Sequence, residues 1–382
     1  MLLNKITITN YLGSLQERHS SALKYIFGVI GTVALVVLLS NPIAEYRLFI
    51  NSASSPTPVP TTNSYGFSTS LDSLSQHDLD MKLSAMQATG ANWVRFDISW
   101  DKVQHDNRAN YDWSSYDHIQ QVLTSHQMHA VGIIEFTPLW ARGSACSNSK
   151  MCPPKDSVSF ANFAATVAKR YSSSGMRDWE IWNEPNISYR YHPQTDPVGY
   201  VALLKVSYTA IKQADPAATV IVGGTAPSAS DASNLRPDDF IKAIYNAGAK
   251  GYFDAIATHP YTYPDVPGDN LPLGAWAQMQ LIHQTMSANG DGNKKIWITE
   301  FGAPTNGPNK TGEYVSEAQQ VHILSEALRL YRSYEWSGPF FWYDYKDTGT
   351  SVGTSENFYG LVRFDNSHKP SYDAWVNGIT HK

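Results

Sequence analysis

The stretch WEIWNEPN, residues 179–186, combines a strand-like apolar run with two glutamates. Its two tryptophans and one isoleucine are typical of a buried strand. A charged carboxylate inside a protein costs free energy unless it is paired. We therefore expect Glu180 to pair with a buried base, and Glu184, at the end of the strand, to take part in chemistry.

Seven more strand-like runs surround this one, and amphipathic helical patterns lie between them. Apolar strands that alternate with helices indicate parallel strands covered by helices. Eight such units predict an α/β fold of the (β/α)8 TIM-barrel type. An open doubly wound sheet would want a glycine-rich turn after the first strand, and none follows it here. The eight runs cover residues 65–70, 92–99, 129–136, 178–185, 218–224, 253–261, 295–303 and 339–345.

The ends of the chain's helical patterns carry capping signals. Asp156, Asp196 and Ser316 each precede an amphipathic run, and Pro197 occupies the first turn of one of them. Side-chain oxygens at such positions accept hydrogen bonds from the first free amides of a helix. These residues therefore predict three helix starts.

Composition narrows the class of partner. The 382 residues carry a net charge of −5 and include 11 Trp and 22 Tyr. No Lys/Arg cluster follows a strip of sequence, which argues against a nucleic-acid partner. The aromatic excess leaves side chains for a surface groove. We expect a monomer.

The N-terminal residues predict a membrane anchor. Residues 25–44 hold 20 uncharged, mostly apolar residues, enough to span a bilayer as a helix. Positive charge in residues 1–24 favours a cytoplasmic N-terminus. A Ser/Thr/Pro-rich linker, 45–64, leads to the barrel domain, 65–382. The alternative is a cleaved signal peptide and a secreted domain; both place the barrel outside the cytoplasm.

The two cysteines, Cys146 and Cys152, lie in a Ser/Asn/Pro-rich stretch. A structural metal site usually needs four ligands, and the chain has no other cysteine. In an oxidising compartment the pair is expected to form a disulfide that closes this loop.

Polar and aromatic residues gather where the predicted strands end. In a (β/α)8 barrel the carboxyl ends of all strands meet at one rim, where catalytic groups lie. We therefore expect a common site there. Its predicted members are Arg95, Trp100, Trp140, Asn183, Glu184, His259, Tyr261, Glu300 and Trp342.

Glu184 and Glu300 end the fourth and seventh strands, so their carboxyl groups should face each other. Two carboxyl groups in a tryptophan-lined cleft suit glycosidic bond cleavage, retaining at about 5–5.5 Å and inverting at about 6.5–9.5 Å. We expect the shorter spacing. A metal held by both glutamates and His259 is conceivable, but this chemistry needs none, so no metal or cofactor is predicted.

The motifs WEIWNEPN and IWITEFGAP, together with WVRFDISWDKVQ, TPLWARG, THPYTYP, FWYDYKD and HKPSYDAW, resemble those of clan A glycoside hydrolases. The resemblance covers about residues 65–378. It is nearest to bacterial family 39-like proteins, which include endoglycosidases of biofilm exopolysaccharides. It implies a retaining (β/α)8 enzyme with Glu184 as acid/base and Glu300 as nucleophile.

The resemblance also implies roles for other residues at the rim. These are Asn183 on the sugar hydroxyl beside the reacting carbon, Arg95 and Tyr261 holding Glu300 ionised, His259 lining the site near the acid/base, and Trp342 under the sugar.

Two departures bear on the substrate. The third strand ends in Glu135 and Phe136, where family 5 cellulases often carry a histidine. Only Thr348–Lys382 follow the barrel strands, where family 39 xylosidases carry a β-sandwich. We therefore expect an open-cleft, endo-acting enzyme on a β-linked polysaccharide or oligosaccharide. The rival interpretations are a non-catalytic glycan-binding surface protein and a structural barrel, and neither explains the placing of the two glutamates.

Overall fold

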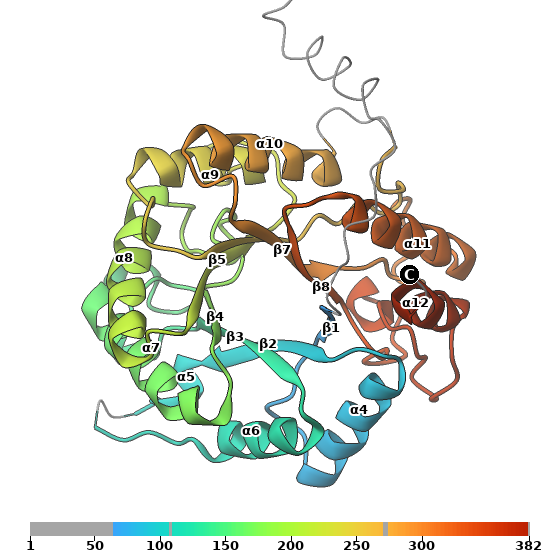
Figure 1. Cartoon of the computed structure of the whole chain (residues 1–382), viewed down its shortest axis with the longest axis horizontal. Coiled ribbons are helices and arrows are strands. Elements are labelled where there is room, and N and C mark those ends of the chain that lie inside the picture. The colour runs from blue at the N-terminus through green and yellow to red at the C-terminus, as the bar shows by residue number, and fades with distance from the viewer. Residues whose placement is uncertain (1–63, 107–108, 270–273, 381–382) are drawn as a thin grey trace, which may run out of the picture. The chain divides into compact units, whose positions relative to one another are not determined.

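The computed structural model describes residues 64–106, 109–269 and 274–380. Eight parallel strands close into a barrel in sequence order, with β8 pairing back onto β1 (Figure 1). The predicted (β/α)8 barrel is therefore confirmed. The strands are β1 Tyr65–Ser68, β2 Trp93–Ser99, β3 His129–Glu135, β4 Asp178–Ile181, β5 Thr219–Thr225, β6 Ala255–Thr258, β7 Lys295–Phe301 and β8 Ser337–Trp342.

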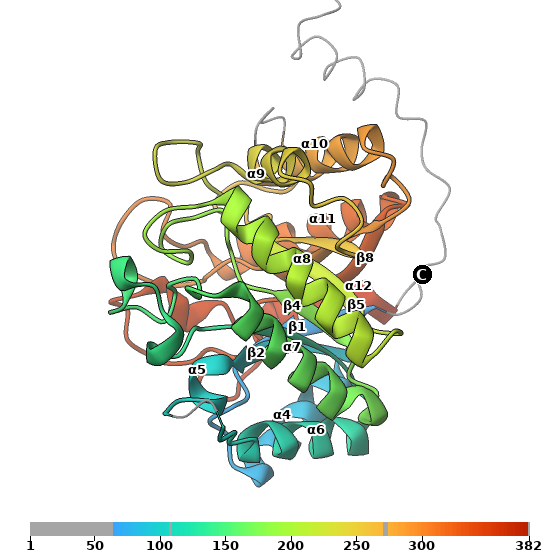
Figure 2. The same ribbon diagram turned by 90° about the vertical axis from the view of Figure 1, so that its left-hand side faces the viewer.

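Helices cover the outside of the barrel (Figures 1 and 2). Asp156, Asp196 and Ser316 cap three of them as expected, and Pro197 lies in the first turn of α8. The helices are α4 Gln76–Ala88, α5 Trp100–Val103, α6 Ser114–His126, α7 Ser157–Tyr171, α8 Pro197–Ala214, α9 Pro237–Asn246, α10 Ala275–Ala288, α11 Glu317–Ser333 and α12 Pro370–Thr380. Short 3-10 helices lie at Leu139–Ala141, Ser144–Cys146, Ser172–Ser174 and Ser355–Phe358.

Side chains alternate between the barrel interior and the layer under the helices, because successive residues of a strand point to opposite faces. A small apolar cluster fills the interior, and Trp93 packs against it. The neighbouring Val94 and Phe96 belong to the larger cluster between strands and helices. On β2 the odd-numbered residues therefore face inward. The interior cluster consists of Val131, Ile221, Ala255, Ala257, Trp297 and Phe341.

The loop after β3 is closed by the predicted disulfide. Cys146 and Cys152 are bonded, with their Cα atoms 5.4 Å apart. The backbones of Arg142 and Pro154 pair beside it in an isolated antiparallel β-bridge. The sequence-based pairing is confirmed, and the loop is held at the same end of the barrel as the strand ends.

Replacing both cysteines by alanine should lower the free energy of unfolding by about 2–3 kcal/mol, because the short closed loop no longer restrains the unfolded chain. Urea unfolding followed by circular dichroism measures this. Reduced wild-type protein should unfold at the same urea concentration as Cys146→Ala/Cys152→Ala. Equal midpoints for oxidised wild type and the double variant would contradict the expectation.

The predicted anchor, residues 25–44, and the linker up to residue 63 lie outside the described residues. Across residues 64–106, 109–269 and 274–380, no helix combines the length and the apolar character that crossing a membrane requires.

Candidate active site

Arg95 lies at the bottom of the site. It points into the barrel from β2 and is 1% exposed. Its Nε and Nη2 atoms donate to the two carboxylate oxygens of Glu180 at 2.7 and 3.0 Å. Its Nη1 donates to Glu300 Oε1 at 2.6 Å, and its Nη2 to Asn183 Oδ1 at 2.8 Å. Glu180 thus pairs with a buried base, as expected, and the base is the arginine of the site.

The charge of Arg95 is held in place by its partners. Burial alone would lower the pKa of this guanidinium, but the charges of Glu180 and Glu300 and their hydrogen bonds raise it above its usual value. A fork-shaped cation that joins two carboxylates also fixes their geometry. Arg95 is therefore a permanent positive charge between Glu180 of β4 and Glu300 of β7.

Glu300 reaches the interior through an irregularity in β7. The pairing of β7 with β8 shifts between Ile298 and Phe301. Both Thr299 and Glu300 face inward, where they bond His259 and Arg95. Phe301 packs in the outer layer instead. The shift is what allows two consecutive residues to serve one site.

The surroundings of Glu300 keep it ionised. The Tyr261 hydroxyl donates to Glu300 Oε2 at 2.9 Å. Burial would raise the pKa of Glu300, but His259, Arg95 and the hydrogen bonds from Tyr261 and Arg95 lower it to about 2. A carboxylate that stays charged at every working pH is suited to nucleophilic attack.

Glu184 follows β4 in a left-handed backbone conformation, with φ of 52°. Such a conformation at a non-glycine residue costs of order 1–3 kcal/mol and is common at functional sites. The Glu184 amide donates to Gly224 O at 2.9 Å. Its Oε1 lies 3.0 Å from His259 Nδ1, and its Oε2 accepts a hydrogen bond from Arg190 Nε at 3.2 Å.

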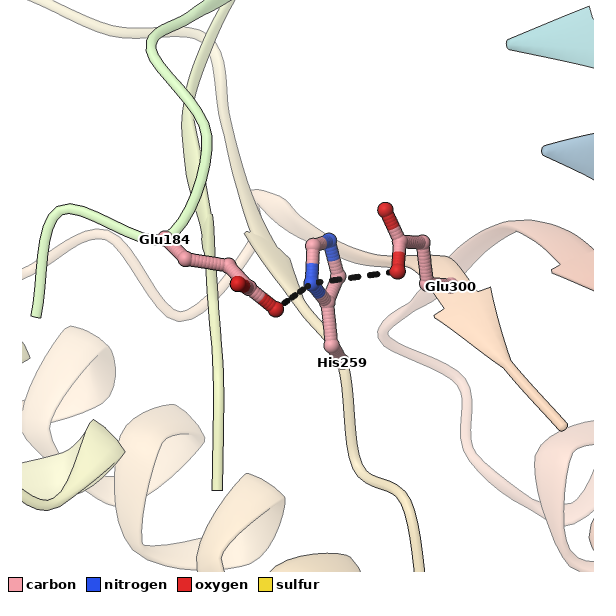
Figure 3. A group of neighbouring side chains, drawn as sticks. All are labelled: Glu184, His259 and Glu300. Carbon is pink, nitrogen blue, oxygen red and sulfur yellow. Dashed lines mark hydrogen bonds and ion pairs between the residues drawn. The ribbon is translucent and has the colours of Figure 1, made fainter. Parts of the chain in front are cut away.

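His259 stands between the two glutamates (Figure 3). It is fully buried, and its Nδ1 lies 3.8 Å from Glu300 Oε2. Its Nε2 lies 3.0 Å from Thr299 Oγ1. A Cβ at Gly224 would come within 2.1 Å of this ring, so the ring needs a glycine there. One atom each from Glu184, His259 and Glu300 lies within 4.8 Å of the others.

That spacing would also suit a metal ion. However, guanidinium groups already bond both carboxylates, Arg190 to Glu184 and Arg95 to Glu300. Positive charge at this distance works against a bound cation. The donor set fits an organic substrate better than a metal, and the expectation of no cofactor stays a prediction.

Two of the expected tryptophans do not face the site. Trp100 and Trp342 are fully buried in the outer layer, where Trp100 packs on Phe163 and Trp342 on Phe301. Both predictions were wrong. Trp342 ends β8 next to the inward-facing Phe341, so alternation turns it outward. Trp100 follows β2 as the first residue of α5 and packs under the helices. Trp140 is half-buried at the rim, edge-on to Trp100, and stays a predicted substrate contact.

The structure adds residues that the sequence analysis missed. Arg190 sits in an irregular loop, and nothing in its spacing marks it. Thr299 was missed because the sequence placed Glu300 in the site, and strict alternation would then turn Thr299 outward. The shifted pairing of β7 brings both residues inward. Tyr343, next to Trp342, could have been found from alternation along β8. It is half-buried, its hydroxyl donates to Glu356 at 3.3 Å, and burial, Glu356, Asp344 and Glu300 raise its pKa.

A parallel (β/α)8 barrel with two facing glutamates at its rim is the architecture of clan A glycoside hydrolases, as the sequence motifs predicted. The family model for cellulases, glycosyl hydrolase family 5, matches residues 52–342, and the chain belongs to this family.

Solved structures share the fold. A family 39 glycoside hydrolase from Bacteroides cellulosilyticus WH2 is 22% identical with a TM-score of 0.67, over 83% of this chain and 63% of that one. A monomeric β-xylosidase from Caulobacter crescentus CB15 is 16% identical with a TM-score of 0.63, over 84% and 68%. GH5_18 from Streptomyces cattleya, in complex with GlcNAc, is 16% identical with a TM-score of 0.63, over 86% and 82%.

The chain thus spans just under two thirds of the length of the family 39 enzyme from Bacteroides cellulosilyticus. No curated protein matches it by sequence.

Proposed function

We propose that this protein is a retaining, endo-acting glycoside hydrolase that cleaves a β-linked polysaccharide or oligosaccharide. The observation that carries the proposal is that two facing carboxyl groups have different surroundings. Glu300 is held ionised by Arg95 and Tyr261, whereas Glu184 reaches the same space from a strained backbone position. Oxygens within 4.8 Å of each other favour the retaining spacing over the wider inverting one.

Two displacements complete the reaction. In the first, Glu300 attacks the anomeric carbon while Glu184, as an acid, gives its proton to the leaving oxygen. In the second, Glu184 as a carboxylate takes a proton from water, which attacks the anomeric carbon and releases Glu300. Arg95 and Tyr261 hold the nucleophile, and Asn183, fixed by Arg95, is placed to meet a sugar hydroxyl.

A screen for released reducing ends tests the activity across β-glucan, xylan, mannan, galactan and bacterial exopolysaccharides. Proton NMR of the first product should show the β-anomer. The α-anomer as first product would overturn the retaining mechanism. Binding to a glycan without released reducing ends would leave a glycan-binding protein instead of an enzyme.

Endo action is supported by exposed apolar side chains on the loops at the rim. Tyr189 is 70% exposed and Leu139 is 62% exposed. Tyr189 precedes Arg190, whose Nε bonds the predicted acid/base, and the Arg190 guanidinium lies 5.4 Å from the Tyr189 ring. The acid/base adjoins the leaving group, so Tyr189 stands where the leaving part of a polymer would extend.

Tyr189→Ala should lower kcat/KM on the polymer by roughly tenfold, the worth of burying one aromatic ring. Activity on an aryl glycoside, which has no sugar there, should not change. Tyr111→Ala is the matched control, because Tyr111 is exposed but stacks on Trp113, which packs on Phe163 in the outer layer. Equal losses on both substrates would argue against this subsite.

We also propose that residues 25–44 anchor a monomeric protein in the membrane with the barrel outside the cytoplasm. The disulfide supports an oxidising compartment, since such bonds are rare in the cytosol. Fractionation of cells, with protease added from outside, tests this arrangement. Full-length protein in the culture medium would contradict it. So would a barrel that the external protease cuts only after the cells have been lysed.

A further inference from the structure

The ion pair between Arg190 and Glu184 conflicts with the first chemical step. Arg190 is bonded to the carboxylate through Nε at 3.2 Å. A neighbouring cation and its hydrogen bond favour the charged form of a carboxyl group. The acid of a glycosidase must instead hold a proton before the bond breaks. Arg190 therefore needs another partner when Glu184 acts as an acid.

Glu135 offers that partner. It ends β3, is 1% exposed, and its Oε2 has no hydrogen-bond partner among the described residues. It lies two positions on from Ile133 and four from Val131, which faces the barrel interior. By alternation Glu135 points inward too. A buried, unpaired carboxyl oxygen is costly, so its presence inside the site calls for a use.

The electrostatic surroundings of Glu135 include Arg190. Burial first, and then the charge of Asp97, raise its pKa well above the usual range, while Arg190, Arg95 and Lys150 act in the opposite direction. These groups come from β2 and from the loops after β3 and β4. Burial therefore favours the neutral form of Glu135 in this arrangement, and among the neighbouring cations Arg190 does most to favour its charged form.

The charges that act on Arg190 complete the set. After burial, which lowers its pKa, the charge of Glu184 raises it most, and Glu135 follows, ahead of Glu300 and Tyr189. Arg190 is 32% exposed on its side chain and lies in a loop, so it is less constrained than Arg95. Glu184, which Arg190 bonds, and Glu135, which has an oxygen without a partner among the described residues, therefore compete for one cation.

We propose that Glu135 is a positioning residue for this reaction: it receives Arg190 from Glu184 when substrate binds, and so leaves Glu184 free to carry the proton for the leaving oxygen. This inference rests on the proposed role of Glu184 as acid/base.

The exchange balances in protons and charge. Before it, Glu135 holds one proton and Glu184 is a carboxylate paired with Arg190. After it, Glu135 has released its proton to solvent and pairs with Arg190, and Glu184 has taken one proton from solvent. Before the glycosidic bond breaks, the two carboxyl groups share one proton. In the first step Glu184 gives that proton to the leaving oxygen. Arg190 then returns to the Glu184 carboxylate, and Glu135 takes a proton from solvent.

Glu135→Gln tests the proposal, because glutamine keeps the shape and cannot become charged. Arg190 should then stay on Glu184. With the sugar found by the screen, kcat/KM for its phenyl β-glycoside should fall roughly tenfold, while that for its 2,4-dinitrophenyl β-glycoside, which needs no proton, should hold. The alkaline limb of the phenyl glycoside profile should move down by about one pH unit. Equal losses on both substrates would overturn the proposal.

A double-variant cycle with Arg190→Gln separates this role from a structural one. Without Arg190 there is no cation to exchange, so Glu135→Gln should add little further loss on the phenyl glycoside. If the full tenfold loss persists in the Arg190→Gln background, Glu135 acts by another route and the proposal fails. The azide experiment on Glu184, described below, tests the proposed function separately, so the two can fail independently.

Discussion

Glu300→Ala is expected to lose activity on every glycoside, by roughly 10⁴-fold or more, because no other group can form the covalent intermediate. Glu184→Ala should behave differently. It should fail on substrates with poor leaving groups but keep much of its first step on a 2,4-dinitrophenyl glycoside, since that leaving group departs without a proton.

Added azide distinguishes the two variants by stereochemistry. In Glu184→Ala, azide should take the place of water in the second step and give a β-glycosyl azide. In Glu300→Ala, azide could only replace the nucleophile itself, which would give the α-anomer. NMR of the azide products is the measurement. If Glu300→Ala keeps the activated substrate and Glu184→Ala loses it, the two roles are reversed. Full activity in both variants would refute the catalytic roles of both glutamates.

The pH dependence of the Glu184→Ala variant tests the environment of the nucleophile, Glu300. Because the pKa of Glu300 is about 2, this residue is ionised at any pH well above that value. The first step of Glu184→Ala on the activated glycoside should therefore be constant from pH 7 down to about 4. A fall centred near pH 4–5 would show that Arg95 and Tyr261 do not lower the pKa of Glu300 as the geometry implies.

Arg95→Met should lower the free energy of unfolding by about 3–5 kcal/mol. It leaves Glu180 and Glu300 close together inside the protein without their shared cation. Activity should also be lost, since the nucleophile is no longer held. Urea unfolding at pH 7 measures the first effect and hydrolysis of the activated glycoside the second.

The loss of folding stability in Arg95→Met should depend on pH, and the direction of that dependence can be stated. In the wild type the folded-state pKa of Glu300 is depressed, so its interactions stabilise the fold above the unfolded pKa and fade as pH falls towards about 2. The gap between wild type and Arg95→Met should therefore narrow at acidic pH.

Arg170→Met is the matched control for stability. Arg170 is an exposed arginine paired with Asp117, and its loss should cost under about 1 kcal/mol. Similar losses in the two variants would mean that the buried pairing at Arg95 contributes no more than a surface ion pair.

The strand ends show which parts of the site follow from sequence. Local patterns were enough for the eight strands, three helix caps and the disulfide, because each depends on residues near one another in the chain. The neighbours of Glu184 and Glu300 could also be anticipated, because in a closed parallel barrel every strand ends at the same rim. Arg95, His259 and Tyr261 do contact the two glutamates there, and Asn183 bonds Arg95 beside them.

The direction of single side chains needed the tertiary structure. Alternation alone would have moved Trp342 outward and brought Tyr343 in, but the same rule fails on β7, where the shifted pairing turns both Thr299 and Glu300 inward. Such a shift depends on how the neighbouring strand pairs, and the sequence of β7 does not contain it.

The sequence by itself determined the barrel, its family motifs and the two facing glutamates, because strand periodicity and motif residues are local properties. Only the tertiary structure placed Arg190 on Glu184 and left a buried oxygen of Glu135 without a hydrogen-bond partner among the described residues. Arg190 lies in an irregular loop and Glu135 at the end of another strand. Their relation depends on the packing of distant segments and on burial, and neither can be read from spacing along the chain.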